Sequence, residues 1–466
     1  MKITSGSPIL RYAGFVCSVT GAKTVGIVIT SITFPYIVRR LGVEAYGQWS
    51  YVVALSSFLN VIADPGMNVF LTQQVAAQKT AAFESIPDVL FLRLIASLIA
   101  ALAVLLISSH EPAATVRLLL RLYGFGILFA SLIVTDHLLT ALELFHVRSL
   151  LNVTQQLVYA ALVFIFVHRA RDLVWLPVGI LSSSMLCSVL GWIVLWRKGV
   201  RFRARLRPNC WPRILRPSLH YAASSLMSNI YHRTGNVLVR WILGDFALGL
   251  YAAAARFVDI VRGFIITFCQ VLLPRIAAAE SAAQLRRLAR LATSTVAVVS
   301  IPLTLGLIGT AHLVVPWVLG KNFLAAVPVL EWMAPYLITA SAASLFCGTI
   351  LFGLGRHRAY LASTAAGAAA GTLLYFTLTP AFGLPGAAFA LVFAELAVAA
   401  VAVGSIPELH DSWKNPVLRV ASGSALLMLL AIKVTNVYTS QIFVVLFVGA
   451  SVYVMSCGWY VRRLFV

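Results

Sequence analysis

Long apolar stretches separated by short polar loops recur along the whole chain of 466 residues. Each stretch holds about 20 residues, enough for an α-helix to cross a hydrocarbon layer about 30 Å thick. Closed β-barrels, the other fold that spans a membrane, show alternating segments of about ten residues instead. The pattern therefore predicts an all-α polytopic membrane protein with about fourteen transmembrane helices. The predicted spans cover residues 12–35, 46–70, 89–108, 117–141, 151–167, 174–196, 218–243, 247–273, 291–311, 325–352, 359–379, 384–404, 417–434 and 440–460.

The composition supports this class and adds an orientation. The chain is 60% hydrophobic and 11% charged, whereas soluble domains are about one quarter charged. The formal net charge is nevertheless +21, and most Lys and Arg residues, Arg93 among them, fall on the side of the two chain ends when the spans are counted. The positive-inside rule therefore places both termini in the cytoplasm. Lys23 lies inside the first apolar run, which predicts a retained helix rather than a cleaved signal peptide.

A short motif occurs twice, about 200 residues apart. LGVEAYG (41–47) and LGDFALG (243–249) share Leu, Gly, Ala and Gly at the same spacing, and each copy lies between two long helices. An even number of intervening spans gives both copies the same direction, which predicts two parallel, pseudo-symmetric six-helix halves. The predicted domains are an N-terminal lobe (1–196), a basic cytoplasmic linker (197–217), a C-terminal lobe (218–404) and two additional helices (405–466). The charge of the linker suits cytoplasmic retention and anionic lipid headgroups.

Several segments resemble the polysaccharide transporter branch of the multidrug/oligosaccharidyl-lipid/polysaccharide exporter superfamily, which contains the O-antigen and exopolysaccharide repeat-unit flippases. The resemblance implies two six-helix lobes around a central cavity and alternating access in the bacterial inner membrane, with an undecaprenyl-diphosphate-linked oligosaccharide as cargo. A polysaccharide polymerase and a chain-length regulator are implied as partners, besides the lipid bilayer. The segments are FPYIVRRLGVEAYGQWS (34–50), ADPGMNVFLTQQVA (63–76), LVRWILGDFALGLYAAAARF (238–257), GKNFLAAVPVL (320–330) and LTPAFGLPGAAFALVFAEL (378–396).

Some of the positive charge lies inside the apolar runs, where a charged group costs about 2.5–3.5 kcal/mol. Polar residues of the seventh span share one helical face, which is either a packed polar interface or a water-filled cavity, and its two arginines favour the cavity. His232, at the margin of this face, is either an interior histidine or a cargo contact. The face comprises Ser218, Ser225, Asn229, Arg233, Asn236 and Arg240. We predict that five cations bind the substrate in one cavity: Lys23, Arg233, Arg240, Arg256 and Arg262.

Two acidic residues near these cations leave alternatives open. Asp259 lies between Arg256 and Arg262 at helical spacing and is able to pair with either of them, which would make the three residues a structural ion-pair relay. Even in that case one positive charge is left for a ligand. Asp64 is predicted to pair with Lys23 or with an arginine of the seventh span, the alternative being a protonatable gate. Asp64-Pro65-Gly66 is also predicted to kink the second span.

The favoured function is a flippase that carries the lipid-linked oligosaccharide to the periplasmic leaflet. A lipid II flippase and a drug exporter of the same fold are the alternatives within transport. A polytopic polysaccharide polymerase or ligase is the alternative among enzymes, and the short outer loops count against it. No metal site, cofactor or nucleic-acid-binding module is predicted. Coupling to H⁺ or Na⁺, through Asp64, Asp259 or Glu395, or to the membrane potential, stays open.

Overall fold

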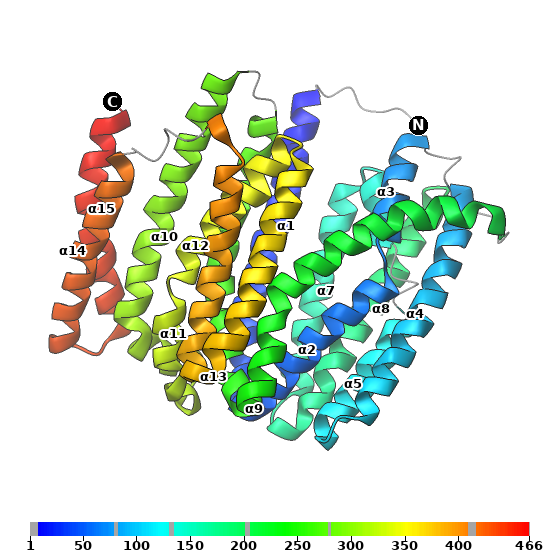
Figure 1. The fold of residues 1–466 in the computed structure, drawn as a ribbon, viewed down its shortest axis with the longest axis horizontal. Helices are drawn as coiled ribbons and strands as arrows, with labels where there is room; N and C mark the ends of the chain where they lie inside the picture. Colours follow the sequence, from blue (N-terminus) through cyan, green and yellow to red (C-terminus); the bar gives the residue numbers. More distant parts are fainter. Residues whose placement is uncertain are drawn as a thin grey trace. The chain divides into compact units, whose positions relative to one another are not determined.

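The structure is a computed structural model that describes residues 8–78, 83–129, 135–200, 206–277, 281–408 and 416–465. These residues form helices and connecting turns, without a strand among them (Figure 1). Residues 201–205 of the predicted linker and 409–415 of the predicted C-terminal segment lie outside the described residues. The α-helices are α1 (Pro8–Leu41), α2 (Val43–Ala63), α3 (Met67–Gln78), α4 (Ile86–Ser109), α5 (Ala114–Leu128), α6 (Thr135–Ala141), α7 (Phe145–Phe166), α8 (Trp175–Arg197), α9 (Trp211–Ala277), α10 (Ala282–Val318), α11 (Val327–Met333), α12 (Tyr336–Ala343), α13 (His357–Gly404), α14 (Pro416–Tyr438) and α15 (Ile442–Phe465).

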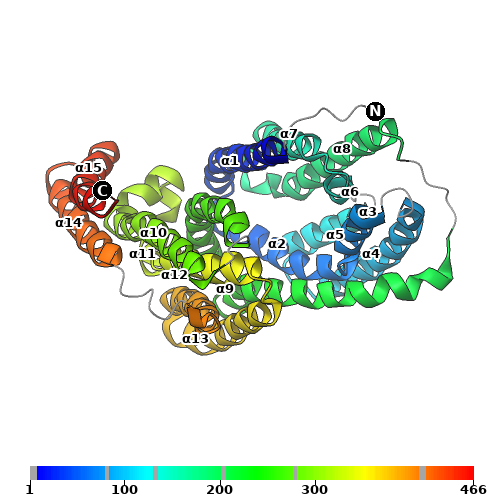
Figure 2. The same ribbon diagram turned by 90° about the horizontal axis from the view of Figure 1, so that it is seen from above.

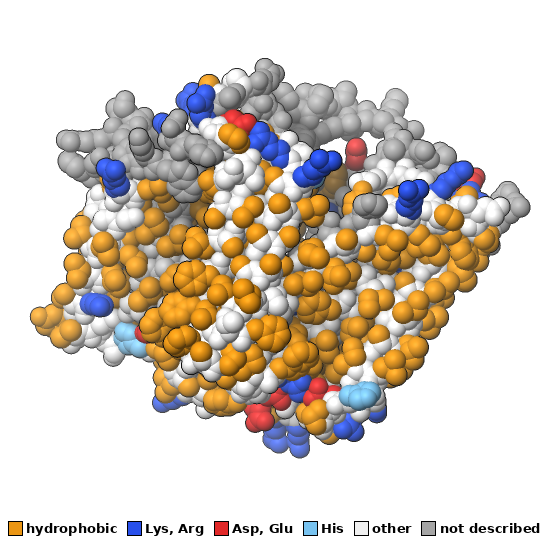
Figure 3. All heavy atoms as spheres, in the orientation of Figure 1, with side chains coloured by type: hydrophobic (Ala, Val, Ile, Leu, Met, Phe, Trp, Pro, Cys, Tyr) orange, Lys and Arg blue, Asp and Glu red, His pale blue; other side chains and the backbone are white. Residues whose placement is uncertain are grey.

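The all-α membrane fold predicted from the sequence is confirmed, but the count of fourteen spans is not. Every predicted span overlaps a described helix. By length and composition, eight of the described helices are able to cross a membrane, or up to ten if each of two bent pairs is one span. Figure 3 shows hydrophobic side chains along the helices and Lys and Arg near their ends on the face in view. This distribution is typical of helices whose middle parts lie in lipid.

The chain divides into two compact units. The first comprises the described parts of Met1–Leu41 and Gln48–Arg233, and the second comprises Gly42–Gly47 and the described parts of Thr234–Val466. The division differs from the predicted lobes, because the first part of α9 belongs to the first unit and the predicted 405–466 segment belongs to the second. In the first unit α1 packs against α7, α7 against α8, and α4 against α5.

Helices α14 and α15 are an integral part of the second unit. They pack against each other and against α10, as Figure 2 shows. Met428 and Ile432 of α14 and Tyr453 of α15 form a buried cluster, and the Tyr453 hydroxyl donates a hydrogen bond to the Val298 carbonyl oxygen at 2.7 Å. This buried packing makes α14 and α15 part of the core of the second unit.

Helix α13 doubles back on itself at Gly383. A straight helix of its 48 residues would be about 72 Å long, yet Arg356 just before it donates a hydrogen bond to the Ser405 carbonyl oxygen just after it, at 3.0 Å. Arg356 also pairs with Glu408 and lowers the pKa of that carboxyl. Gly383 has a non-helical backbone (φ 63°, ψ −137°). The two legs of α13, yellow and orange in Figure 1, therefore run antiparallel.

Helix α9 is also broken at a glycine, the second residue of the repeated motif. Gly244 has φ 88°, and the side chain of Tyr375 contacts both sides of the break: its hydroxyl lies 2.6 Å from that of Tyr251, and a β-carbon at Gly235 would lie within 3.0 Å of its ring. The equivalent glycine of the first motif, Gly42, has φ 77°. Both copies of the motif thus use their first glycine to turn the chain between helices.

The last glycine of each motif packs against the backbone of the other motif. A β-carbon at Gly47 would come closer than 3.0 Å to the carbonyl oxygen of Asp245, and one at Gly249 closer than 3.0 Å to that of Val43. These pairings are reciprocal, since each joins the seventh residue of one copy to the third residue of the other. The two copies of the motif that the sequence predicts as a repeat therefore contact each other symmetrically.

Replacement of Gly47 by Ala is expected to destabilise the protein by about 1–3 kcal/mol, because the backbone it meets cannot rotate away. The midpoint of thermal unfolding in detergent measures this effect. Gly423→Ala is the matched control, since Gly423 lies within α14 with no atom within 4 Å of an added β-carbon. Equal midpoints for Gly47→Ala and the unaltered chain would show that the contact tolerates a side chain.

The predicted kink of the second span is confirmed. Helices α2 and α3 meet at Asp64-Pro65-Gly66 with a bend of 52°, and Gly66 has φ 82°. A β-carbon at Gly66 would lie closer than 3.0 Å to the Ser218 carbonyl oxygen of α9. The start of α9 is therefore seated in this bend.

Candidate functional site

The ten predicted site residues belong to both units. Those of the first unit are Lys23, Asp64, Asn229, His232 and Arg233; those of the second are Asn236, Arg240, Arg256, Asp259 and Arg262. Only Asp259 and Arg262 form an ion pair with each other within the described chain. The site is accordingly described unit by unit.

Asp64 has a different partner from those predicted. Its carboxylate accepts a hydrogen bond from the Asn68 amide, one turn later on α3, at 2.5 Å. The side-chain oxygen of Asn68 in turn accepts from Arg93 at 3.0 Å, and Arg93 is close enough to Asp64 to interact electrostatically. Asn68 and Arg93 therefore hold the bend between α2 and α3. The predicted pairing of Asp64 with Lys23 or with an arginine of the seventh span stays a prediction.

The sequence analysis counted Arg93 among the loop cations on the side of the two chain ends, and this placement is wrong. It lies on α4 and is 3% exposed, so it is an interior residue and not a charge in a loop. The count failed because Arg93 lies near the start of an apolar run, where position along the chain does not separate an interfacial residue from a buried one. A buried Arg needs an acidic or polar partner. Asp64 and Asn68 lie one helical turn apart at the predicted kink, and this polar pair inside an apolar run is the sequence signal that could have indicated a buried cation nearby.

Lys23 lies near a second cation. Helix α1 packs against α7, and Arg148 of α7 interacts electrostatically with Lys23. The Arg148 Nε lies 2.8 Å from the Asp136 Oδ1, and Asn152 donates to the same oxygen at 3.4 Å. Asp136 therefore pairs with Arg148, and Lys23 lies on the other side of this ion pair's cation.

The predicted polar face of the seventh span is uneven. Ser218 is buried and its hydroxyl donates to the Ile214 carbonyl oxygen, whereas Ser225 is exposed. Asn229 donates to the Ser225 carbonyl oxygen at 3.0 Å, and His232 is exposed. Packing against the α2–α3 bend thus explains the buried Ser218 at the start of this face. It does not explain the polar residues later on the face, from Ser225 onward.

Arg233 is half-buried and forms no ion pair with any described residue. Tyr123 of α5 is near enough to interact with it electrostatically, and the Tyr123 hydroxyl is hydrogen-bonded to Asn60 of α2. Asn60, Tyr123 and Arg233 give the first unit a polar group that includes a cation without a carboxylate beside it. Such a group suits an anion with several oxygen acceptors.

Arg240 stabilises the turn within α9. Its Nε forms an ion pair with Asp245, across the break at Gly244, and both side chains are largely buried. Asn236, one turn earlier, is half-buried. Asp245 is also the residue whose carbonyl oxygen faces Gly47. Arg240 therefore has an acidic partner and a structural position, unlike Arg256, which is exposed and forms no ion pair within the described chain.

Arg262 lies between two carboxylates. Its guanidinium nitrogens are 3.3 Å from the Asp259 carboxylate and 3.5 Å from that of Glu395, which is 3% exposed. The Tyr336 hydroxyl donates to Asp259 at 3.1 Å, and the Arg262 guanidinium lies 5.3 Å from the centre of the Tyr336 ring. Asp259 therefore pairs with Arg262, which leaves Arg256 as the helix arginine beside it that forms no ion pair within the described chain.

The chain is similar to known proteins over most of its length. A family model described as polysaccharide biosynthesis protein matches residues 16–280, more than half of the chain. The protein belongs to this family. This member of the polysaccharide biosynthesis protein family is 22% identical, over 374 residues, to a protein of Escherichia coli (strain K12) described as "Putative O-antigen transporter", with 79% of this chain and 90% of that one covered.

Solved structures with the same fold are membrane transporters. The lipid II flippase MurJ, in an inward closed conformation, matches with a TM-score of 0.80 at 14% identity, covering 97% of this family member and 99% of MurJ. An inward-facing multidrug resistance MATE transporter of the MOP superfamily matches with 0.63 at 17% identity, covering 88% and 99%. A MOP superfamily transporter from Pyrococcus furiosus matches with 0.59 at 15%, covering 89% and 100%. This member of the polysaccharide biosynthesis protein family thus shares its fold with multi-pass membrane transporters of known structure.

Proposed function

We propose that the protein is a flippase that moves an undecaprenyl-diphosphate-linked oligosaccharide from the cytoplasmic to the periplasmic leaflet by alternating access. The observation that carries the proposal is the family match over residues 16–280 together with the fold of a lipid II flippase along nearly the whole chain. The O-antigen transporter relative supports an oligosaccharide cargo. Surface polysaccharide synthesis requires such a step, because the repeat unit is assembled on one side of the membrane and polymerised on the other.

The diphosphate is the part of the cargo that the helix cations are suited to bind. Arg233 and Arg256 form no ion pair within the described chain, and Lys23 lies close enough to Arg148 to interact with it electrostatically. Arginine offers a planar fork of donors that binds two phosphate oxygens at once, while lysine supplies a point charge. We assign cargo binding to Lys23, Arg233 and Arg256, and structural roles to Arg240 and Arg262. Asn229, His232 and Asn236 are proposed to contact the sugar or the diphosphate.

The remaining features of the proposal follow from the charge pattern and the family. Both termini lie in the cytoplasm of a bacterium, the protein resides in the inner membrane, and a polymerase and a chain-length regulator act on the product. Outward movement of an anionic cargo is driven by the membrane potential, at about 2.3 kcal/mol per charge per 100 mV. The drug-exporter alternative is disfavoured because cationic drugs require acidic cavities, whereas Arg233 and Arg256 are cations without an acidic partner.

Transport by the purified protein tests the proposal directly. The chain is reconstituted in vesicles that carry an isoprenoid-diphosphate oligosaccharide with a fluorescent sugar, and a membrane-impermeant quencher measures the fraction that changes leaflet. We expect protein-dependent movement of this lipid and slower movement of lipid II at the same mole fraction. Movement of lipid II alone would favour the lipid II flippase, and movement of neither lipid would contradict a flippase.

A further inference from the structure

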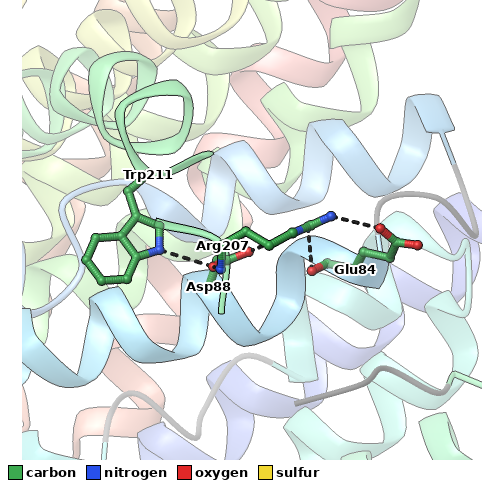
Figure 4. Close-up of polar contacts among 4 residues, drawn as sticks. All are labelled: Glu84, Asp88, Arg207 and Trp211. Carbon is green, nitrogen blue, oxygen red and sulfur yellow. Dashed lines mark hydrogen bonds and ion pairs between the residues drawn. The ribbon is translucent and has the colours of Figure 1, made fainter. Parts of the chain in front are cut away.

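Two polar groups of the first unit differ in how far the protein satisfies them. In the group of Figure 4, Asp88 at the start of α4 accepts hydrogen bonds from the Arg207 backbone nitrogen at 2.7 Å and from the Trp211 indole nitrogen at 3.1 Å. The Arg207 guanidinium donates to Asp88, to the Glu84 carboxylate and to the Glu84 carbonyl oxygen. Both Asp88 oxygens and all three Arg207 guanidinium nitrogens thus have partners in the protein, and this group fixes the start of α9.

The other group is a polar strip along α7, inside a candidate membrane span. At about 100° per residue its members fall within an arc of about 100°, and they cover about 12 Å of the helix axis. Lipid does not accommodate such a strip, so it faces protein, water or a ligand. We call it the α7 strip: Arg148, Asn152, Gln155 and Gln156.

Three helices border the α7 strip. The Asn152 amide donates to Asp136 of α6 at 3.4 Å, and the Gln155 amide donates to the Ser184 hydroxyl of α8 at 2.8 Å. Gln156 lies against α1. Figure 2 shows α1, α7 and α8 together on one side of the first unit. The strip therefore lies on the protein-facing side of α7.

Gly26 of α1 makes room for the Gln156 amide. A β-carbon at Gly26 would lie 2.6 Å from the Gln156 Nε2 and 2.7 Å from its Oε1. Lys23 precedes Gly26 by about one turn. Because Tyr36 further along α1 contacts Phe164 further along α7, the two helices run in the same direction. Lys23 is therefore at the level of the middle of the α7 strip.

The three amides of the strip keep hydrogen-bonding capacity that the protein leaves unused. Each amide has an oxygen that accepts and a nitrogen that donates twice. Among the described residues none donates to the oxygens of Asn152, Gln155 or Gln156, and Gln156 has no partner at its nitrogen either. All three side chains are half-buried, and buried polar groups without a protein partner are satisfied by water or a ligand.

We propose that the α7 strip binds the sugar next to the diphosphate of the cargo, an inference that rests on the flippase function proposed for the protein. A sugar hydroxyl both donates and accepts, as an amide does, so amides in a row match the hydroxyls of a sugar. A diphosphate needs donors and cations only. Arg148 is paired with Asp136, which suits a neutral ligand, and Lys23 holds the diphosphate beside the strip.

Binding is measured on the purified full-length protein in detergent by native mass spectrometry. The probes are undecaprenyl diphosphate and the undecaprenyl-diphosphate-linked oligosaccharide extracted from the cells that naturally produce the protein. We expect the sugar-bearing lipid to bind about tenfold or more tightly than the bare diphosphate, through two or three hydrogen bonds to hydroxyls. Asn152→Leu with Gln156→Leu is expected to abolish this preference and to leave the affinity for the bare diphosphate unchanged.

Two further variants separate the strip from general effects. Asn322→Leu with Gln441→Leu removes one amide of each kind from exposed positions of the second unit and is expected to keep the preference. Gly26→Ala removes no polar group, but its β-carbon displaces the Gln156 amide, so the preference is expected to fall by about three- to tenfold. The midpoint of thermal unfolding checks that each variant is folded.

An unchanged preference in the α7 double variant would overturn the proposal, and so would an equal loss of affinity for both probes. If that variant does not fold, Gly26→Ala decides, because an unchanged preference there would equally reject the sugar site. An unaltered protein that binds both probes equally would also reject it, while leaving the diphosphate site intact. Failure of the flippase function looks different, since the unaltered protein would then bind neither probe, and the sugar site would be rejected with it.

Discussion

Replacement of Arg256 by Gln is expected to lower transport of the lipid-linked oligosaccharide by about 10- to 100-fold, and replacement of Arg233 by Gln to do the same. Each variant removes charge-assisted hydrogen bonds to the diphosphate, worth about 1.5–3 kcal/mol. Neither arginine has an ion-pair partner in the described chain, so these substitutions leave no buried acid unpaired there. The measurement is surface polysaccharide in a bacterial strain that lacks its own repeat-unit flippase, with membrane protein levels determined by immunoblot.

Arg419→Gln is the control for this experiment. Arg419 is an exposed cation of α14, and its loss changes the net charge by the same amount without touching the proposed cargo site. Normal polysaccharide in both the Arg233 and the Arg256 variants, at normal protein levels, would remove these residues from the cargo site. Equal defects in all three variants would point to net charge instead.

Replacement of Glu395 by Leu is expected to be the most destabilising single substitution considered, at about 3–5 kcal/mol. It leaves the Arg262 guanidinium, which is 15% exposed, without one of its two carboxylates. The double variant Arg262→Met, Glu395→Leu is expected to recover most of this loss, because it replaces both charges with apolar groups of similar size. The midpoint of thermal unfolding of the purified protein measures both effects.

Transport by the same double variant separates a structural from a cargo-binding role for Arg262. If the role is structural, the folded double variant keeps its flipping activity in vesicles. A double variant with a normal unfolding midpoint but no transport would return Arg262 to the cargo site, as the sequence pattern first suggested.

The helices and their breaks could be predicted from the sequence because they depend on local properties. Apolar runs of membrane length predicted where helices lie, and Asp64-Pro65-Gly66 predicted the bend between α2 and α3, which is 52°. The repeated LGVEAYG and LGDFALG motifs gave the two-fold relation between their turns. These signals lie within a few residues of the feature that they predict.

The partners of the charged residues could not be predicted, because they depend on neighbours distant in the chain. Glu395 lies 133 residues after Arg262, and the sequence offers several other acids at comparable separations. Arg240 looked like a cargo residue from its helical face, yet its partner Asp245 lies beyond a turn that brings the two together. A helical-face analysis assumes a continuous helix, so it fails at a break such as Gly244.

The reciprocal glycines also impose an order on biosynthesis. Residues 42–47 pack in the second unit, yet they leave the ribosome about 200 residues before their partners at 243–249. At about 5–20 residues per second this interval lasts about 10–40 s. During this time all of the first unit is synthesised, and its helices are able to pack. Residues 42–47 have no partner segment yet and face lipid or the insertion machinery. The first turn of the protein is thus among the last parts to reach its final contacts.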